Sequence, residues 1–349
     1  MDKCPNEILT LIFVEACTDD GLAGRSLSLV SRCIHDTSRR YALQSVALYG
    51  FYQLSAFASL LDKSDPEDRY VRHLYVSDRP RGWIEYLPGQ GREDWLAGRV
   101  DEHFHFDDPS PNHSTSSLLH ILKTVSPTLE TLALLLFDRY DKQPLSDALC
   151  LPKLRELTLH GSNLTRPDHS ELAQCLALRR LHVVQNVSIR GSMTKAVSHL
   201  APLLTHLRIS RIVANRFASG DVVLGLESML QQDDLASTGF PPTLKCVLVQ
   251  MLQVGTQDRN GHAAVSPSLM AQQLKDVAMR DVQRRIVLLK PTIVLWGAVG
   301  TLIGEISDVE FYAALKLAWQ ERVSGAESAV WEVESSSILA SYGYYAEEG

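Results

Sequence analysis

The chain has 349 residues, enough for about two domains or for one elongated domain with a large buried core. Apolar residues make up 45% and charged residues 21%, which excludes wholesale disorder, a collagen-like structure and a long coiled coil. The net charge of -7 argues against nucleic acid as a partner, because a phosphate backbone would be repelled.

The first forty residues have a helical pattern. Apolar residues recur at helical spacing from Ile8 to Ala16, directly after Pro5, a residue suited to a helix start. A second helix is predicted over residues 27–37, after a polar break at residues 18–21. We expect residues 1–42 to form a helical module that is too small to be stable alone.

A repeated pattern follows this module, consisting of leucine, two variable residues, leucine, one variable residue and an aliphatic residue. It begins at Leu129, Leu154, Leu178 and Leu204, in steps of 25, 24 and 26 residues. These steps are typical of leucine-rich repeats, whose period is about 20 to 29 residues. Weaker copies begin at Leu43, Val71 and Leu244, so the array is expected from about residue 43 to about residue 254.

Each repeat predicts a short strand with one buried face, followed by an outer helix such as those expected at residues 117–122 and 171–176. Stacked repeats would form an α/β solenoid with a curved parallel inner sheet and outer helices, over residues 43–349. Few repeats carry the asparagine that closes regular turns, so the solenoid should be irregular. Cys150 and Cys175 precede successive strands, and both are expected to be buried packing residues.

Two regions depart from the repeat. Residues 80–113 form an irregular insertion whose aromatic residues are candidates for substrate contacts; the alternative is that they are partly buried over the edge of the repeats. Its acidic and histidine-rich run at residues 101–108 fits a flexible loop better than a metal site, and no metal site is predicted. Residues 269–334 are expected to cover the end of the solenoid, with a helix near 269–279, a strand at 285–289 and a helix after Asp308.

The N-terminal residues resemble a known family. Cys4-Pro5-Asn6-Glu7-Ile8-Leu9-Thr10-Leu11-Ile12-Phe13, followed by Leu27-Ser28-Leu29-Val30-Ser31-Arg32-Cys33-Ile34, is similar to an F-box, particularly in fungal F-box proteins that continue into leucine-rich repeats. The resemblance covers about residues 4–48. Cys4 stands where the family has leucine, and Ile34 stands where many members have tryptophan.

The resemblance implies that the helices dock on the Skp adaptor of a cullin-RING ubiquitin ligase, while the solenoid holds a protein substrate. The chain would then be a non-catalytic substrate receptor without a cofactor. The residues that match the motif, and so are expected at the adaptor, are Pro5, Ile8, Leu9, Ile12, Phe13, Leu27, Val30 and Ile34. The alternative is that they are all core residues, and one sequence does not divide them; about half are expected to touch the partner.

Substrate contacts are expected from variable strand residues, because alternate side chains of a strand point away from its core. The candidates are Arg155, Thr158, Arg180, His182, His206 and Arg208. A second hypothesis is a leucine-rich scaffold whose box-like helices only cap the solenoid and recruit no ligase. An unrecognised hydrolase is a third, although phosphate-loop, dinucleotide, nucleophile-elbow and zinc-protease motifs are all absent.

The sequence also suggests a compartment. None of the six cysteines forms a C-x-x-C pair, and no secretory apolar segment follows Met1. The most apolar stretch, residues 293–303, is shorter than the roughly 20 residues that a membrane helix needs. A cytoplasmic or nuclear protein without a membrane partner is therefore expected.

Overall fold

The computed structural model describes residues 4–79, 81, 111–137, 144–145, 149–160, 164, 173–184, 192–213, 220–230, 239–257, 263–265, 269–296, 302–325 and 331. The fold is α/β, and the strands of its sheet follow one another in chain order from β1 to β8. The predicted α/β class with parallel strands is confirmed. The chain divides into two compact units, one of Met1–Glu156 with Asp308–Ala326, the other of Leu157–Ser307 with Glu327–Gly349.

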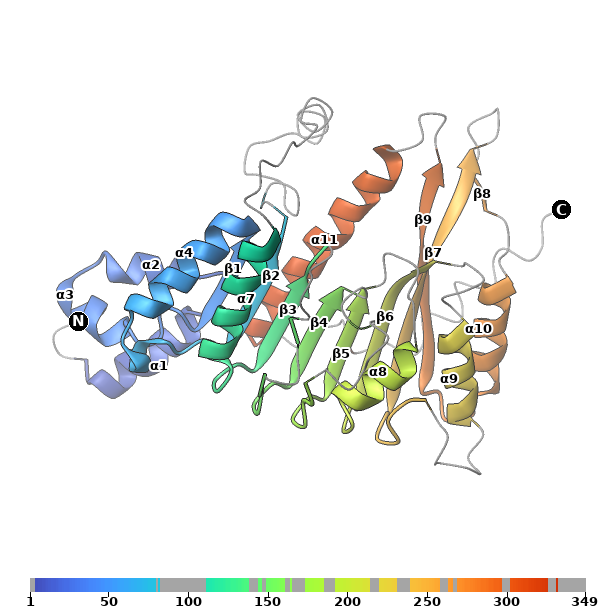
Figure 1. The fold of residues 1–349 in the computed structure, drawn as a ribbon, viewed down its shortest axis with the longest axis horizontal. Coiled ribbons are helices and arrows are strands. Elements are labelled where there is room, and N and C mark those ends of the chain that lie inside the picture. Colours follow the sequence, from blue (N-terminus) through green and yellow to red (C-terminus); the bar gives the residue numbers. More distant parts are fainter. Residues whose placement is uncertain are drawn as a thin grey trace. The chain divides into compact units, whose positions relative to one another are not determined.

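The first unit begins with three short helices and continues into alternating strands and helices (Figure 1). Its elements are α1 (Asn6–Ala16), α2 (Leu22–Ser28), α3 (Arg32–Ser38), β1 (Ser45–Tyr49), α4 (Gly50–Lys63), the 3-10 helix η1 (Pro66–Asp68), β2 (His73–Ser77), α7 (Pro111–Val125), β3 (Thr131–Leu135) and, from Asp308, helix α11 (Leu302–Val323). Strand β4 (Glu156–His160) contains the boundary between the units.

Strands β1, β2 and β3 are parallel and pair in the register of the repeat. Leu74 of β2 is opposite Val46 of β1 and Leu132 of β3, and these three residues occupy the same position of the repeated pattern. The strands predicted from this pattern are therefore confirmed. A strand was expected at the second and third apolar positions of each repeat, and each strand includes these two positions.

Helices α4 and α7 cover the leucine face of these strands and lie side by side (Figure 1). Each has a buried stripe of apolar residues at helical spacing, which explains why both segments form helices against a sheet. The stripes are Leu54, Phe57, Ala58 and Leu61 in α4, and Leu118, Ile121, Leu122 and Val125 in α7. The helix expected at residues 117–122 is thus confirmed as part of α7.

The second unit repeats this plan. Its elements are β5 (Arg180–Val184), α8 (Met193–Leu200), β6 (His206–Val213), α9 (Gly220–Leu230), β7 (Cys246–Gln257), β8 (Ala263–Val265), α10 (Leu269–Arg280) and β9 (Ile286–Trp296). Strands β5, β6, β7 and β9 pair in parallel, and β8 is antiparallel to β7. Helices α8 and α9 are in contact, as are α9 and α10.

Three local expectations need correction. Residues 173–176 are not helical, so the helix expected at 171–176 is wrong over its described part. The strand expected at residues 285–289 is β9, but it pairs with β7 and continues the sheet instead of only covering its end. The helix expected after Asp308 is the C-terminal part of α11, and residues 308–326 belong to the first unit instead of closing the last repeat.

The first unit contains a buried histidine between two of its strands. Nδ1 of His73 lies 2.6 Å from Oγ1 of Thr131, its partner on β3, in a buried hydrogen bond. Burial, assisted by the positive charge of Arg72, lowers the pKa of His73 to about 4. The native protein therefore holds this imidazole neutral at pH values where an unfolded chain would protonate it.

We predict that the free energy of unfolding falls as the pH is lowered from 6.5 towards 4, by roughly 2 kcal/mol at pH 5 from this residue, because only the unfolded state binds the proton. His73→Asn keeps a hydrogen-bonding side chain and removes this contribution. Urea unfolding at pH 7 and pH 5 measures the difference. Equal acid sensitivity of the two proteins would contradict the assignment.

Candidate functional site in the N-terminal helical module

The helices α1, α2 and α3 share a small core of their own. Leu9, Phe13 and Ile34 are buried, and the partly buried Cys4, Leu27 and Tyr41 pack against them. Of the eight residues predicted at the adaptor, Leu9, Phe13 and Ile34 are therefore core residues, and Leu27 supports them. A substitution at Phe13 would test the folding of the module instead of an external contact.

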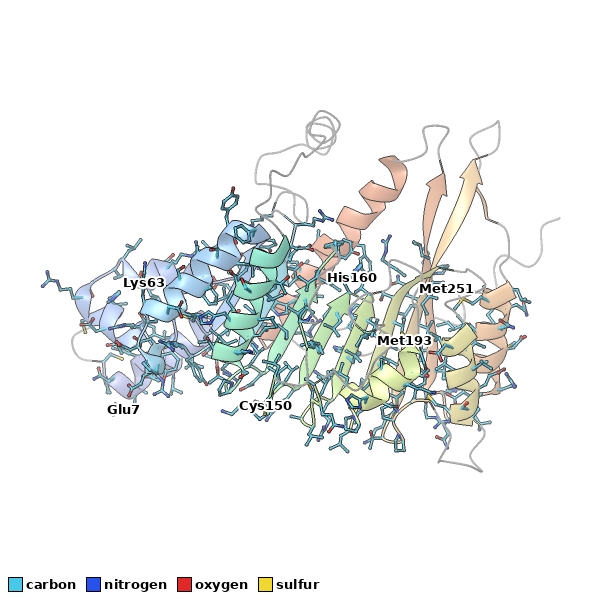
Figure 2. All side chains as sticks on the ribbon, viewed as in Figure 1. Glu7, Lys63, Cys150, His160, Met193 and Met251 are labelled. Atoms are coloured by element: carbon cyan, nitrogen blue, oxygen red, sulfur yellow. The ribbon has the colours of Figure 1, made fainter. Side chains whose placement is uncertain are left out.

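The other four predicted adaptor residues face solvent. Pro5 is exposed, and the exposed fractions are 46% for Ile8, 51% for Ile12 and 63% for Val30. Ile8 and Ile12 are one helical turn apart, and Leu11 beside them is 62% exposed. We call Ile8, Leu11 and Ile12 the α1 stripe. Glu7, labelled in Figure 2, precedes this stripe in the first turn of the same helix.

The link between α2 and α3 exposes two more large apolar residues. One helix was expected over residues 27–37, but the chain forms two, and the break lies at Leu29–Ser31. The hydroxyl of Ser31 accepts a hydrogen bond from the backbone N–H of Ile34 at 3.2 Å, so this serine begins a new helix. Leu29 is left 87% exposed and Val30 63% exposed.

Sequence reasoning missed Leu11, Leu22 and Leu29 as exposed apolar residues of the module; Leu22 is 55% exposed. A signal for Leu29 was present, because Val30-Ser31 combines a β-branched residue with a preferred N-cap residue. Leu11 carried no such signal. Its exposure depends on which side of α1 meets α3, and a helical period alone does not choose between adjacent apolar positions.

The module is attached to β1 by polar and close backbone contacts. The side chain of Gln44 donates to the carbonyl of Val14 at 2.9 Å, and the hydroxyl of Ser45 donates to the carbonyl of Asp19. A Cβ on Gly24 would lie 2.3 Å from the carbonyl oxygen of Ala42, so only glycine allows α2 to approach this closely. The attachment therefore does not use the α1 stripe.

Helix α11 covers the variable face of the sheet in the first unit. Trp319 packs on Tyr75 of β2 with ring centroids 5.6 Å apart, and Tyr312 packs on Phe137 at 4.8 Å. Nζ of the buried Lys316 lies 3.9 Å from a carboxylate oxygen of Asp20, between α1 and α2, and 4.9 Å from the Trp319 ring. An open concave face was expected here, and in the first unit it is filled.

The six predicted substrate residues differ in their exposure to solvent. Arg155 and Arg180 are exposed, His206 and Arg208 are partly buried, and Thr158 and His182 are 2% and 1% exposed. The rings of His182 and His206 both contact the buried Trp331, at 6.5 and 6.2 Å between centroids. The expectation that all six face an open surface is thus corrected for Thr158 and His182, because both are buried and Trp331 lies against His182.

The two cysteines that precede successive strands differ in burial. Cys175 is buried as expected, whereas Cys150, labelled in Figure 2, is exposed and does not pack.

Apart from Arg81 and the first residues of α7, the insertion at residues 80–113 lies outside the described residues, including its acidic run. Among the described residues, no three His, Cys, Asp or Glu side chains gather in a way that could hold a metal ion.

None of the described helices combines the length and apolar character that crossing a bilayer requires.

Comparison with known proteins gives no relative. No protein-family model, no curated protein and no solved structure matches the chain.

We predict that Trp319→Ala lowers the free energy of unfolding by about 3 to 5 kcal/mol, because it empties the contact between α11 and β2. Leu317, two residues earlier, is 56% exposed, so Leu317→Ala should cost less than about 1 kcal/mol. Urea unfolding of both variants makes the comparison. Similar losses would show that the buried face of α11 is assigned incorrectly.

Proposed function

We propose that this chain is the substrate-recognition subunit of a Skp-cullin-F-box type ubiquitin ligase. Its N-terminal module would bind the Skp adaptor, and its repeat region would bind a protein substrate. One observation carries the proposal: the module has its own core yet leaves the α1 stripe, Leu29 and Val30 exposed. The resemblance of residues 4–48 to an F-box adds the identity of the partner.

The exposed residues suit an interface of a few apolar anchors. Complete burial of an aliphatic side chain is worth about 1.5 to 3 kcal/mol, so five half-exposed or more exposed side chains offer on the order of 5 kcal/mol to a partner. Exposed apolar groups of this kind on a small module are typical of protein interfaces. Leu9, Phe13 and Ile34 would form the core beneath these exposed side chains.

The alternative is a leucine-rich scaffold whose helices only cap the first strand. A cap would bury Pro5 and Ile8 against the first repeat, since covering apolar surface is its purpose. Both residues are exposed, and contacts to β1 come from Gln44 and Ser45. These contacts favour the receptor, although Phe13 is buried as a cap would require.

The repeat region would be an irregular leucine-rich solenoid. Its support is the spacing of 24 to 26 residues and the pairing of equivalent apolar positions, such as Leu181 with Leu207 and Val183 with Ile209. Arg155 and Arg180 remain exposed for a substrate. The proposal assigns these residues no catalytic role and requires neither a metal nor a cofactor.

The test is co-purification of the full chain with the Skp adaptor. Ile8→Asp combined with Val30→Asp should weaken binding by about a hundredfold or more, because each carboxylate would be buried against an apolar partner. Leu60→Asp is the matched control, since Leu60 is 45% exposed on α4, outside the module. This control should bind as the unmodified chain does.

The double variant should unfold at the same urea concentration as the unmodified chain, because both side chains are already in solvent. Retained adaptor binding by a folded double variant, or a well-folded unmodified chain that forms no complex, would reject the proposal in favour of the scaffold.

A further inference from the structure

The second unit has four equivalent turns at the beginning of its parallel strands. In each turn, a backbone N–H donates to the carbonyl three residues before it: Leu178 to Cys175, Leu204 to Ala201, Leu244 to Pro241 and Arg284 to Asp281, at 3.0 to 3.1 Å. They precede β5, β6, β7 and β9, which are neighbours in that order. We call residues 175–179, 201–205, 241–245 and 281–285 the turn edge.

The turns hold apolar side chains out from the sheet. Leu176 is 59% exposed, Leu203 is 42% exposed and Val282 is 94% exposed, and Pro242 at the same level is also exposed. These residues occupy the second or third position of their turns, which project beyond the strands. Four neighbouring turns that each expose an apolar residue form an unusual row, because solvent-exposed turns normally carry polar residues.

Basic residues run along the same edge. The carbonyl of Arg179 accepts from the N–H of Thr205 at 3.0 Å, and the carbonyl of Thr205 accepts from the N–H of Lys245 at 2.8 Å. These three residues are therefore in line across β5, β6 and β7, with adjacent strands about 4.8 Å apart. Arg179, Lys245 and Arg284 of the turn edge are all exposed.

Acidic residues do not balance these charges within the described turn edge. Asp281 is its one carboxylate, and it is 5% exposed, with oxygens that accept from the N–H groups of Gln283 and Ile286 and lie near Arg285. The corresponding position of the first unit is different. There Arg72 donates two hydrogen bonds of 3.0 Å to Glu130, so a basic residue is neutralised by its neighbour.

The positive potential acts on a neighbouring group. The pKa of His206 is lowered, first by burial and then by the charges of Arg180 and Lys245. This effect places Lys245 of the turn edge, and Arg180 at the start of β5, within electrostatic reach of one imidazole. The chain as a whole carries a net charge of -7, so the edge differs in sign from the average surface.

We propose that the turn edge is a docking surface for an acidic protein segment that carries large apolar side chains. Carboxylates of such a segment complement Arg179, Lys245 and Arg284, and its apolar side chains cover Leu176, Leu203 and Val282. The inference goes beyond the proposed function, because this surface acts whether or not the helical module binds an adaptor.

The test uses the full chain and two fluorescent peptides of about twelve residues with leucines at the same positions. One peptide has glutamate at every other position and the second has lysine. The glutamate peptide should bind, and the lysine peptide should bind at least about tenfold more weakly. Equal affinities, or no binding of the glutamate peptide at millimolar concentration, would overturn the proposal.

Substitutions within the turn edge test whether the glutamate peptide binds there. Arg179→Glu with Lys245→Glu should weaken binding of the glutamate peptide by about tenfold or more, and Leu176→Ser with Val282→Ser should weaken it severalfold. Lys63→Glu, an exposed charge reversal at the end of α4 (Figure 2), is the control and should change affinity by less than about twofold. Variants that bind as the control does would overturn the assignment.

A lipid surface is the competing source of negative charge. If vesicles of phosphatidylserine and phosphatidylcholine sediment the chain through Arg179 and Lys245 while the glutamate peptide does not bind, the protein partner is wrong. Ile8→Asp should leave peptide binding unchanged, and the charge-reversed edge should still bind the Skp adaptor. A failure of peptide binding can therefore be distinguished from a failure of adaptor binding.

Discussion

Both faces of the parallel sheet are buried in the first unit, and this burial determines which groups remain exposed to a partner. Every residue of β1, β2, β3 and β4 is buried, although alternate side chains point to opposite faces. In the first unit the leucine face lies under α4 and α7, and the variable face lies under α11. Parallel sheets are typically covered on both sides, and the strands of the first unit follow that rule.

Burial of the strands limits which residues a partner can contact. A leucine-rich array with an open inner face would offer its variable strand residues to a partner, but here Thr158 and His182 are covered. Exposed apolar and charged groups lie instead on the N-terminal module and on the turns that begin β5, β6, β7 and β9. The recognition surfaces that we propose are therefore helices and turns instead of a face of the sheet.

The contacts of α11 also combine polar and apolar character. Lys316 is almost completely buried, yet it lies near the carboxylate of Asp20 and over the rings of Tyr75 and Trp319. Arg322 pairs with Glu156 at the end of the same helix face. A buried cation needs such partners, because removal from water costs several kcal/mol. These contacts specify one position for α11 against the strands.

The repeat made the strands predictable, because a pattern at a fixed period defines both the element and its register. The start at Leu178 predicted β5, and its partner at Leu204 predicted β6 and their pairing. The outer helices were less predictable, since short apolar runs such as residues 173–176 fit a helix or an irregular turn equally well. The local pattern of apolar residues does not distinguish a helix from an irregular turn.

The candidate site was predictable in part. Apolar spacing identified α1 and the residues that match the motif, but it did not separate core residues such as Phe13 from exposed ones such as Ile12. That division depends on which face of α1 meets α3, a tertiary choice. The cover provided by α11 and Trp331 was also beyond local reasoning, because both segments are far in sequence from the strands whose face they cover.

We propose that the N-terminal module docks on the Skp adaptor. Hydrogen exchange of the full chain, alone and mixed with the adaptor, measures this most directly, since amides at a new interface become protected. We expect slower exchange within α1 and from α2 through α3, with β1 to β3 unchanged. Unchanged exchange in these helices, or protection confined to other elements, would contradict the account.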